Sequence, residues 1–309
     1  MSALSLTELP ERVKIVEMGP RDGLQNETNV VSTADKVRFI DLLSASGLAA
    51  IETTSFVRPS AIPQLDDAEA VMAAIARRPG VTYLALTPNT RGLDRARSAG
   101  MRAVAVFTAA SESFTKRNIN MTIDESLKTF ATVVRDARRE GMWVRAYVST
   151  AFGCPYEGDV SVEAVVRVAS ALAELGVDEI SIGDTIGVAT PRDVVEVAGA
   201  LQAHMPVERL AMHFHDTRGT ALANVVAALQ MKISIFDSSA GGLGGCPYAP
   251  GATGNLATED LLYMLDGMGI ETGVSLDGVR AASRFLAGAI GREPVSRAYR
   301  ALEAAAARA

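Results

Sequence analysis

Cysteine, histidine and aromatic residues are scarce in this sequence. Its 309 residues include two cysteines, three histidines and one tryptophan, and aromatic side chains make up 5% of the total. Two cysteines are too few for the disulfide framework of a small secreted domain. We therefore expect Cys154 and Cys246 to be free thiols in a reducing compartment.

Long apolar runs and an excess of positive charge are also missing. No stretch of about 18 uncharged apolar residues occurs, and the first residues contain Glu8 and Glu11 without the basic and apolar regions of a signal peptide. The formal net charge is −6 and the isoelectric point is near 5.3, which argues against a nucleic-acid or anionic-membrane partner. We expect a cytoplasmic protein that binds neither.

Hydrophobic residues are plentiful, at 48% of the chain, and no shift in composition or Pro/Ser-rich linker divides it. The sequence therefore predicts a single domain over residues 1–309. Glycine gathers at 241–255, where six glycines surround Cys246. We interpret this segment as a mobile lid that carries a thiol, with a plain surface linker as the alternative.

A helix, a glycine and an apolar strand recur along the chain. The glycines stand at 47, 100, 141 and 176, where helices are expected to end. Helix starts are marked by the capping box at 122–125 and by Thr190 before Pro191. The apolar, β-rich runs lie near 13–18, 49–55, 81–86, 102–108, 142–149, 178–183, 209–214 and 232–238.

Eight strands separated by helices predict an α/β fold of the (β/α)8 TIM-barrel class, with the barrel over about 13–270. Additional helices are expected from about 274 to 309. The connection at 109–121, after the fourth strand, is long enough to predict a functional loop.

Polar residues follow several of the predicted strands at their C-terminal ends, where barrel enzymes place their active sites. His213 and His215 are two residues apart on a strand, so their imidazoles point to the same side. Barrel closure brings Asp22 close to them, which suggests a site for magnesium, manganese or zinc. Hydrogen-bonded structural histidines are the alternative. The candidate residues are Arg21, Asp22, Glu52, Asp184, His213 and His215.

Arg21 and two residues outside this group also have structural interpretations. Arg21 at a barrel mouth suits a carboxylate or an oxyanion, or forms a salt bridge to Glu52 or Asp184. Cys154 is expected to be a packing residue. His204 is expected to be exposed near a helix end.

Six segments around these positions form a recognisable set. They are VEMGPRDGLQNE at 16–27, IETTSF at 51–56, FTKRNIN at 114–120, GDTIG at 183–187, HFHDT at 213–217 and the segment around Cys246. In these segments the sequence resembles the 3-hydroxy-3-methylglutaryl-CoA lyases, and the similarity covers about residues 13–290. The Arg-Asp-Gly-x-Gln and His-x-His motifs are shared with a wider superfamily of metal-dependent lyases and Claisen-condensing barrels, whereas the cysteine segment is specific to the lyases.

The resemblance implies a metal-dependent retro-Claisen cleavage of an acyl-CoA, 3-hydroxy-3-methylglutaryl-CoA, into acetyl-CoA and acetoacetate. It also implies a divalent cation, Mg²⁺ or Mn²⁺, on Asp22, His213, His215 and Asn255. Of the expected catalytic set Cys246, Arg21, Asp22, His213, Glu52 and Asp184, Cys246 would transfer a proton and Arg21 would lie at the substrate carbonyl. Arg21, Ser181 and Asn118 are the expected substrate contacts, and a homodimer is left open.

The chain departs from the family pattern at Arg58, Ala61 and Arg218, which leaves open a lyase for another 3-hydroxyacyl-CoA or a condensing synthase. Lys232 stands where glycine often ends the seventh helix. Lys116 and Arg117 are candidates for the CoA phosphates or for solvated surface charge. A non-catalytic metal-binding scaffold is the distant alternative.

Overall fold

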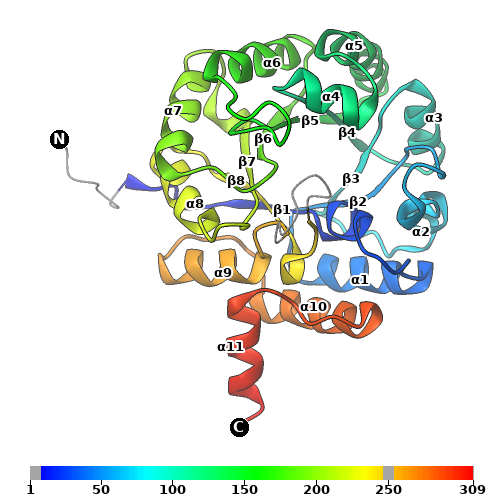
Figure 1. The fold of residues 1–309 in the computed structure, drawn as a ribbon. Coiled ribbons are helices and arrows are strands. Elements are labelled where there is room, and N and C mark those ends of the chain that lie inside the picture. Colours follow the sequence, from blue (N-terminus) through cyan, green and yellow to red (C-terminus); the bar gives the residue numbers. More distant parts are fainter. Residues whose placement is uncertain (1–7, 246–253, 309) are drawn as a thin grey trace.

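The computed structural model describes residues 8–245 and 254–308. Eight parallel strands close into a barrel in chain order, and β1 pairs with β8. Figure 1 shows the strands at the centre of a ring of helices. The predicted (β/α)8 barrel is therefore confirmed. The strands are β1 (Lys14–Glu17), β2 (Ala50–Ser55), β3 (Thr82–Leu86), β4 (Ala103–Ala109), β5 (Trp143–Ser149), β6 (Glu179–Asp184), β7 (Leu210–Phe214) and β8 (Ile235–Ser238).

Helices follow the strands around the barrel, and short helical turns lie at several strand ends. None of the helices in the described ranges is both long and apolar enough to cross a membrane. The α-helices are α1 (Thr33–Ala45), α2 (Ala68–Ala74), α3 (Thr90–Ser98), α4 (Glu112–Ile119), α5 (Ile123–Arg139), α6 (Val162–Glu174), α7 (Pro191–Gln202), α8 (Ala221–Gln230), α9 (Thr258–Gly267), α10 (Leu276–Ile290) and α11 (Arg297–Ala306). The short turns are η2 (Gly19–Gly23), η3 (Pro63–Leu65), η4 (Val207–Arg209) and η5 (Ala240–Gly242).

Local signals for helix ends are confirmed. The glycines at 47, 100, 141 and 176 all have positive φ, and Thr122 forms a capping box with Glu125 at the start of α5. Lys232 adopts φ 65° after α8, and the backbone N–H of Ile233 still donates to Ala228. The eighth strand therefore begins at Ile235 rather than at 232, because this turn occupies the intervening residues.

The connection at 109–121 is not the irregular loop that its position suggested. It contains α4, whose first turn is capped because the Ser111 side chain accepts a hydrogen bond from the Phe114 backbone. Glu112 of α4 also accepts a hydrogen bond from the Ile123 backbone at 3.0 Å, which ties α4 to α5. The helix holds Phe114 and Asn118 at the mouth of the barrel.

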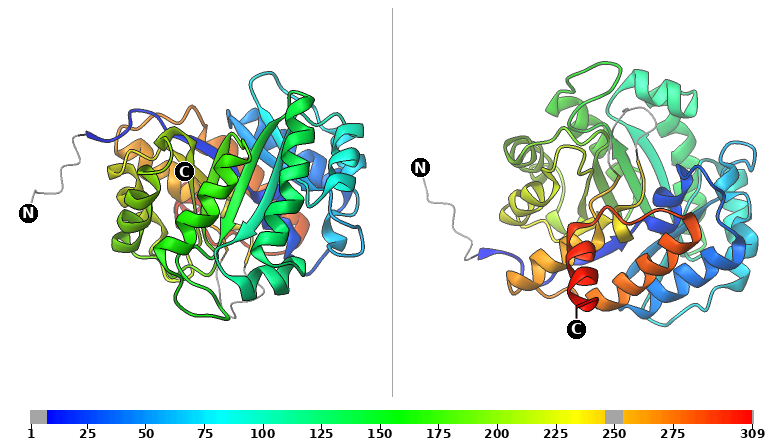
Figure 2. Two further views of the ribbon diagram at one scale, coloured as in Figure 1. Left: turned by 90° about the horizontal axis from the view of Figure 1, so that it is seen from above. Right: turned by 60° about the horizontal axis from the view of Figure 1, so that its bottom comes forward.

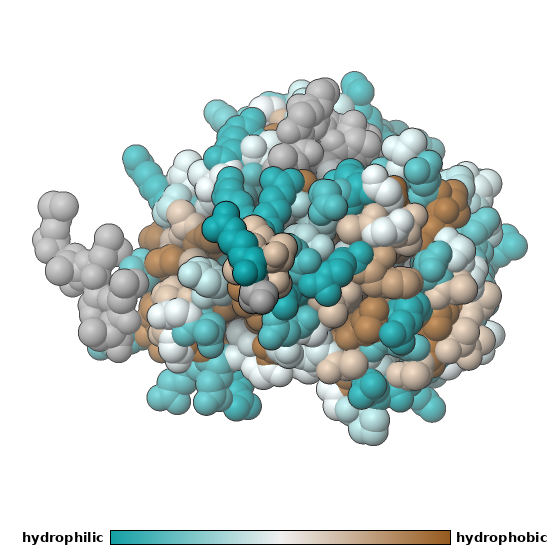
Figure 3. All heavy atoms as spheres, turned by 90° about the horizontal axis from the view of Figure 1, so that it is seen from below, coloured by the Kyte–Doolittle hydropathy of each residue, from teal (hydrophilic) through white to brown (hydrophobic). Residues whose placement is uncertain are grey.

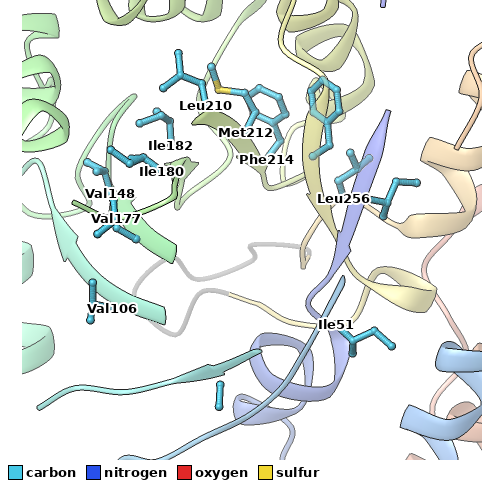
Figure 4. Close-up of a cluster of buried hydrophobic side chains, with 14 of the residues drawn as sticks. Ile51, Val106, Val148, Val177, Ile180, Ile182, Leu210, Met212, Phe214 and Leu256 are labelled. Carbon is cyan, nitrogen blue, oxygen red and sulfur yellow. The ribbon is translucent and has the colours of Figure 1, made fainter. Parts of the chain in front are cut away.

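Side chains alternate between two cores. Those pointing outward from the strands, such as Val148, Ile182 and Phe214, pack under the helices, as Figure 4 shows. Those pointing inward include small residues such as Ala105 and Ala211. The space that they leave holds Arg145, the largest fully buried side chain in the described ranges.

The C-terminal helices pack beside the barrel rather than in its ring. In Figure 2, α10 lies alongside α1 and α11 crosses toward α9. The expectation of extra helices after about 274 is confirmed. On the face that includes these helices, hydrophobic and hydrophilic residues are interspersed (Figure 3).

Candidate active site

A cavity of about 440 Å³ opens at the C-terminal ends of the strands. The first candidates, Arg21 and Asp22, lie in η2, which directly follows β1. The wall contains both polar and apolar side chains. The lining residues are Arg21, Asp22, Gln25, Asn26, Val57, Ala61, Ile62, Gln64, Leu86, Pro88, Phe107, Phe114, Asn118, Ile119, Tyr147, Val148, Ser149, Ser181, Gly183, Thr185, His213, His215 and Gly245.

Asp22, His213 and His215 converge in this cavity as the sequence predicted. One potential ligand atom from each residue lies within 4.8 Å of the others. The two imidazole centroids are 5.2 Å apart, because His213 is the penultimate residue of β7 and His215 follows its end on the same side. Three donors from the ends of β1 and β7, between which only β8 lies, can therefore surround one small ion.

Asn255 completes this group from the other end of the glycine-rich segment. Its Nδ2 donates to Asp22 Oδ2 at 2.9 Å and to the Leu243 carbonyl at 3.0 Å. Asn255 Oδ1 and His215 Nδ1 are buried and have no hydrogen-bond partner in residues 8–245 and 254–308. A carboxylate, two imidazoles and an amide oxygen that lacks a partner are a donor set that fits a divalent cation such as Mg²⁺ or Mn²⁺.

The surroundings of Asp22 and His215 favour the protonation states in which these groups bind metals. Burial alone would raise the pKa of Asp22, but Arg21 and the two imidazoles hold it below its ordinary value. Burial, together with the charge of His213, lowers the pKa of His215 to about 4. At neutral pH Asp22 is therefore an anion and His215 a neutral imidazole, the forms that bind metals.

Arg21 is held between two carboxylates. Its Nε donates to Glu52 Oε2 at 2.6 Å, and its Nη1 donates to Asp22 Oδ1 at 2.8 Å. Burial would lower the pKa of Arg21, but these two carboxylates raise it above its ordinary value. The salt bridge to Glu52 that the sequence left open is present, and Arg21 still lines the cavity.

Glu52 and Asp184 do not line the cavity. Glu52 is fully buried and contacts Arg21, and burial raises its pKa despite this partner. Asp184 accepts hydrogen bonds from the backbone of Val188 at 2.9 Å and Ala189 at 3.0 Å, and burial raises its pKa to about 6. The structure thus places Glu52 behind Arg21, and Asp184 at the end of β6, where it holds the backbone of the following loop.

The expected substrate contacts Ser181 and Asn118 both line the cavity, from β6 and α4. Of the departures from the family pattern, Ala61 lines it, whereas Arg58 is exposed and does not. Arg218 donates to the carbonyls of Ile186 at 3.0 Å and Gly187 at 2.9 Å. Ala61 is therefore the departure best placed to contact a molecule bound in the cavity.

Two basic residues lie on α4 beside Asn118. Lys116 and Arg117 are exposed, and the Arg117 guanidinium stacks over the Tyr156 ring at 4.3 Å. Cys246, the expected proton-transfer residue, lies outside the described residues. Its neighbour Gly245 lines the cavity, and the Gly245 carbonyl accepts a hydrogen bond from Asn26 Nδ2 at 2.8 Å.

Known proteins are similar to this chain in both sequence and fold. The profile of the HMGL-like family matches residues 12–286. The mitochondrial hydroxymethylglutaryl-CoA lyase of Pongo abelii is 52% identical over 301 residues, which cover 97% of this chain and 93% of that protein. The chain belongs to the HMGL-like family.

Solved structures of HMGL-like proteins superpose closely on it. The HMG-CoA lyase of Bacillus subtilis is 50% identical with a TM-score of 0.95, covering 96% of this chain and 100% of that one. An HMG-CoA lyase of Acinetobacter baumannii, solved with coenzyme A and 3-methylmalate, is 37% identical with a TM-score of 0.89, covering 96% and 95%.

In this HMGL-like chain, the sequence did not single out two charged residues beneath the cavity, Asp237 and Arg145. Asp237 accepts hydrogen bonds from Ser181 at 2.8 Å and from Arg145 at 2.7 Å, and it lies 3.2 Å from His213 Nδ1. The sequence did contain a signal for these residues, because each is the single charged residue of its strand: Arg145 in β5 and Asp237 in β8. Only the closed barrel shows that the two charges meet.

Proposed function

We propose that this chain cleaves 3-hydroxy-3-methylglutaryl-CoA into acetyl-CoA and acetoacetate with the help of a divalent cation. One observation carries the proposal. Asp22, His213 and His215 converge within 4.8 Å beside the Arg21 guanidinium, in a chain 52% identical to a hydroxymethylglutaryl-CoA lyase. A retro-Claisen cleavage needs one electrophilic group at the alkoxide and another at the enolate. The bound cation would be the first of these groups, and the Arg21 guanidinium is the second.

The metal ligands in this proposal are Asp22, His213, His215 and Asn255. A bound Mg²⁺ or Mn²⁺ would act as a Lewis acid on substrate oxygens and lower the pKa of the tertiary hydroxyl. Asn255 uses its amide N–H to hold Asp22 and leaves its Oδ1 for the ion. Asp22, His213 and Cys246 are the candidates to accept the hydroxyl proton, and His213 can accept it only while one ring nitrogen is free of both hydrogen and metal.

Arg21 stabilises the enolate that forms as the carbon–carbon bond breaks. A permanently charged guanidinium favours the developing negative charge over the neutral thioester, and Glu52 fixes its orientation through the 2.6 Å hydrogen bond. Cys246 protonates the enolate carbon, because a thiol with a pKa of about 8.5 both keeps and gives a proton near neutral pH.

The substrate enters with its acyl group toward Arg21 and the metal ligands. Ser181 and Asn118 contact the substrate, and the exposed Lys116 and Arg117 on α4 receive the CoA phosphates. The A. baumannii relative was solved with coenzyme A, which supports a CoA thioester as the substrate class. A cytoplasmic location and a homodimer remain predictions.

A coupled assay for acetoacetate release tests the proposal. We expect turnover with Mg²⁺ or Mn²⁺, loss of turnover with a chelator, and recovery when metal is restored. His213→Ala and His215→Ala should each lower Mn²⁺ affinity by more than about 10- to 100-fold, the loss typical of residues that only support a ligand. His204→Ala is the matched control, because His204 is exposed and should bind Mn²⁺ as the wild type does.

The same assay separates the alternatives. Faster cleavage of another 3-hydroxyacyl thioester would change the substrate but keep the reaction, and Ala61, in the cavity wall, is the first position to vary. Turnover of no thioester in the presence of metal would contradict the proposal and favour a metal-binding scaffold.

A further inference from the structure

A line of alternating charges runs through the barrel interior beneath the cavity. It begins at Lys14, whose Nζ lies 2.7 Å from Glu179 Oε2. Glu179 Oε1 accepts from Arg145 Nε at 2.7 Å, and Arg145 Nη2 donates to Asp237 Oδ1 at 2.7 Å. The line ends at His213, 3.2 Å from Asp237. These are inward-facing side chains of β1, β6, β5, β8 and β7.

The line is electrically balanced and fully enclosed at its centre. Lys14 and Arg145 offset Glu179 and Asp237, and the side chains of Arg145 and Asp237 have no exposed surface. A buried charge is tolerated only when it is paired and hydrogen-bonded. Arg145 therefore keeps Asp237 in its anionic form.

Asp237 is placed to accept from His213. The two residues are register partners in the β7–β8 pair, so their side chains stand next to each other inside the barrel. Asp237 Oδ1 is taken by Arg145, whereas Oδ2 accepts from Ser181 and faces His213 Nδ1. An ionised carboxylate can only accept hydrogen bonds, so the hydrogen between the two groups belongs to His213.

We propose that Asp237, held by Arg145, is a positioning residue that fixes His213 as the Nδ1–H tautomer and leaves Nε2 to bind the metal. The inference rests on the metal site of the proposed function. The other ring nitrogen of a metal-binding histidine commonly donates to a carboxylate, which fixes both its tautomer and its orientation.

The second imidazole provides a contrast. His215 Nδ1 is buried and has no hydrogen-bond partner in the described ranges, so no carboxylate accepts a hydrogen bond from that nitrogen. Asp237 therefore fixes the tautomer of His213 and not that of His215. This difference makes the proposal specific to His213 and measurable.

Histidine-selective NMR can read the tautomer directly, because the chain has only three histidines and His204 is exposed. In ¹⁵N-histidine-labelled wild-type protein without metal, at a pH where the His213 imidazole is neutral, we expect His213 to carry its single ring hydrogen on Nδ1. In Asp237→Asn we expect a mixture of tautomers, and Mn²⁺ affinity measured by calorimetry should fall about 10- to 100-fold.

Glu179→Gln is the matched control. It changes the same line of charges on the far side of Arg145 and leaves the contact between Arg145 and Asp237 in place. We expect its His213 signal to match the wild type. A change as large as that in Asp237→Asn would show that the charge line as a whole, and not Asp237, governs His213, and would overturn the proposal.

The wild-type spectrum decides the matter even if Asp237→Asn does not fold. An Nε2–H tautomer of His213 in the wild type would overturn the inference, as would unchanged tautomer and Mn²⁺ affinity in Asp237→Asn. Failure of the wild type to bind Mn²⁺ would instead contradict the proposed function, while the tautomer would still report on Asp237.

Discussion

Of the two cysteines, the structure describes Cys154. Cys154 is a free thiol, 3% exposed, and its Sγ accepts a hydrogen bond from Ser111 at 3.0 Å. It packs with Ala109 and Phe114, so the expectation that it is a packing residue is confirmed. Cys246 lies in the glycine-rich segment, outside the described residues, and its chemical role remains a prediction.

We predict that Cys246→Ala loses turnover while substrate affinity stays close to that of the wild type. Loss of a positioned general acid costs about 10²- to 10⁴-fold in rate, and the steady-state measurement should show this in kcat and not in KM. Thiol alkylation should inactivate the wild type, because Cys154 is buried and only Cys246 is left to react. A variant that keeps more than about a tenth of wild-type kcat would remove Cys246 from proton transfer.

At the scale of elements, the site depends on how the segment at Gly254 and Asn255 packs against the ends of β7 and β8. Asn255 pairs with His215 in an isolated bridge, and Gly254 precedes it in close contact with the segment after β8. A Cβ atom on Gly254 would overlap the carbonyl oxygens of Gly242 and Gly244. Only glycine at 254 therefore lets Asn255 reach Asp22.

We predict that Gly254→Ala weakens metal binding and leaves the barrel folded. The displaced backbone should shift Asn255 away from Asp22 and lower Mn²⁺ affinity at least about tenfold, as loss of a supporting contact does. Gly267→Ala is the control, since a Cβ there meets nothing within 4 Å and alanine suits a helix better than glycine. Equal Mn²⁺ affinity in the two variants, measured by calorimetry, would contradict this account of the contact.

At the scale of the whole molecule, a buried carboxylate joins the barrel to its C-terminal part. Glu17 of β1 accepts hydrogen bonds from the backbone of Gly19 and Ala240, both at 2.8 Å. It also accepts one from Thr258 Oγ1 at 2.7 Å. Burial raises the pKa of Glu17 to about 7 even though these hydrogen bonds oppose the shift.

This pKa predicts a pH dependence of folding. Between about pH 4.5 and 7 the unfolded chain releases the Glu17 proton while the folded chain keeps it, so rising pH lowers the free energy of unfolding. A shift of this size is worth up to about 3 kcal/mol. In Glu17→Gln this contribution should be absent, so the variant should gain stability relative to the wild type from pH 5 to pH 8.

Urea denaturation at several pH values provides the measurement. The wild-type free energy of unfolding minus that of Glu17→Gln should fall as the pH rises. A difference that stays constant from pH 5 to pH 8 would show that Glu17 has an ordinary pKa in the folded protein.

The sequence alone determined the barrel and the group of candidate metal ligands. Each strand and helix is specified by a short stretch of residues, through side-chain periodicity, caps such as Thr122 and glycines at helix ends. Eight such units are compatible with few architectures. In a (β/α)8 barrel, residues at the C-terminal ends of the strands gather at one end of the barrel, which places Asp22, His213 and His215 together.

Tertiary structure decided which side chains meet inside the barrel. Whether Arg145 reaches Asp237 depends on the register of nonadjacent strands and on the space left by small neighbours such as Ala105. It also decided that Glu52 orients Arg21 and that α4 forms at 109–121. The physical reason is that hydrogen bonds between distant residues depend on positions set by the whole closed sheet, whereas helix caps and strand periodicity act within a few neighbouring residues.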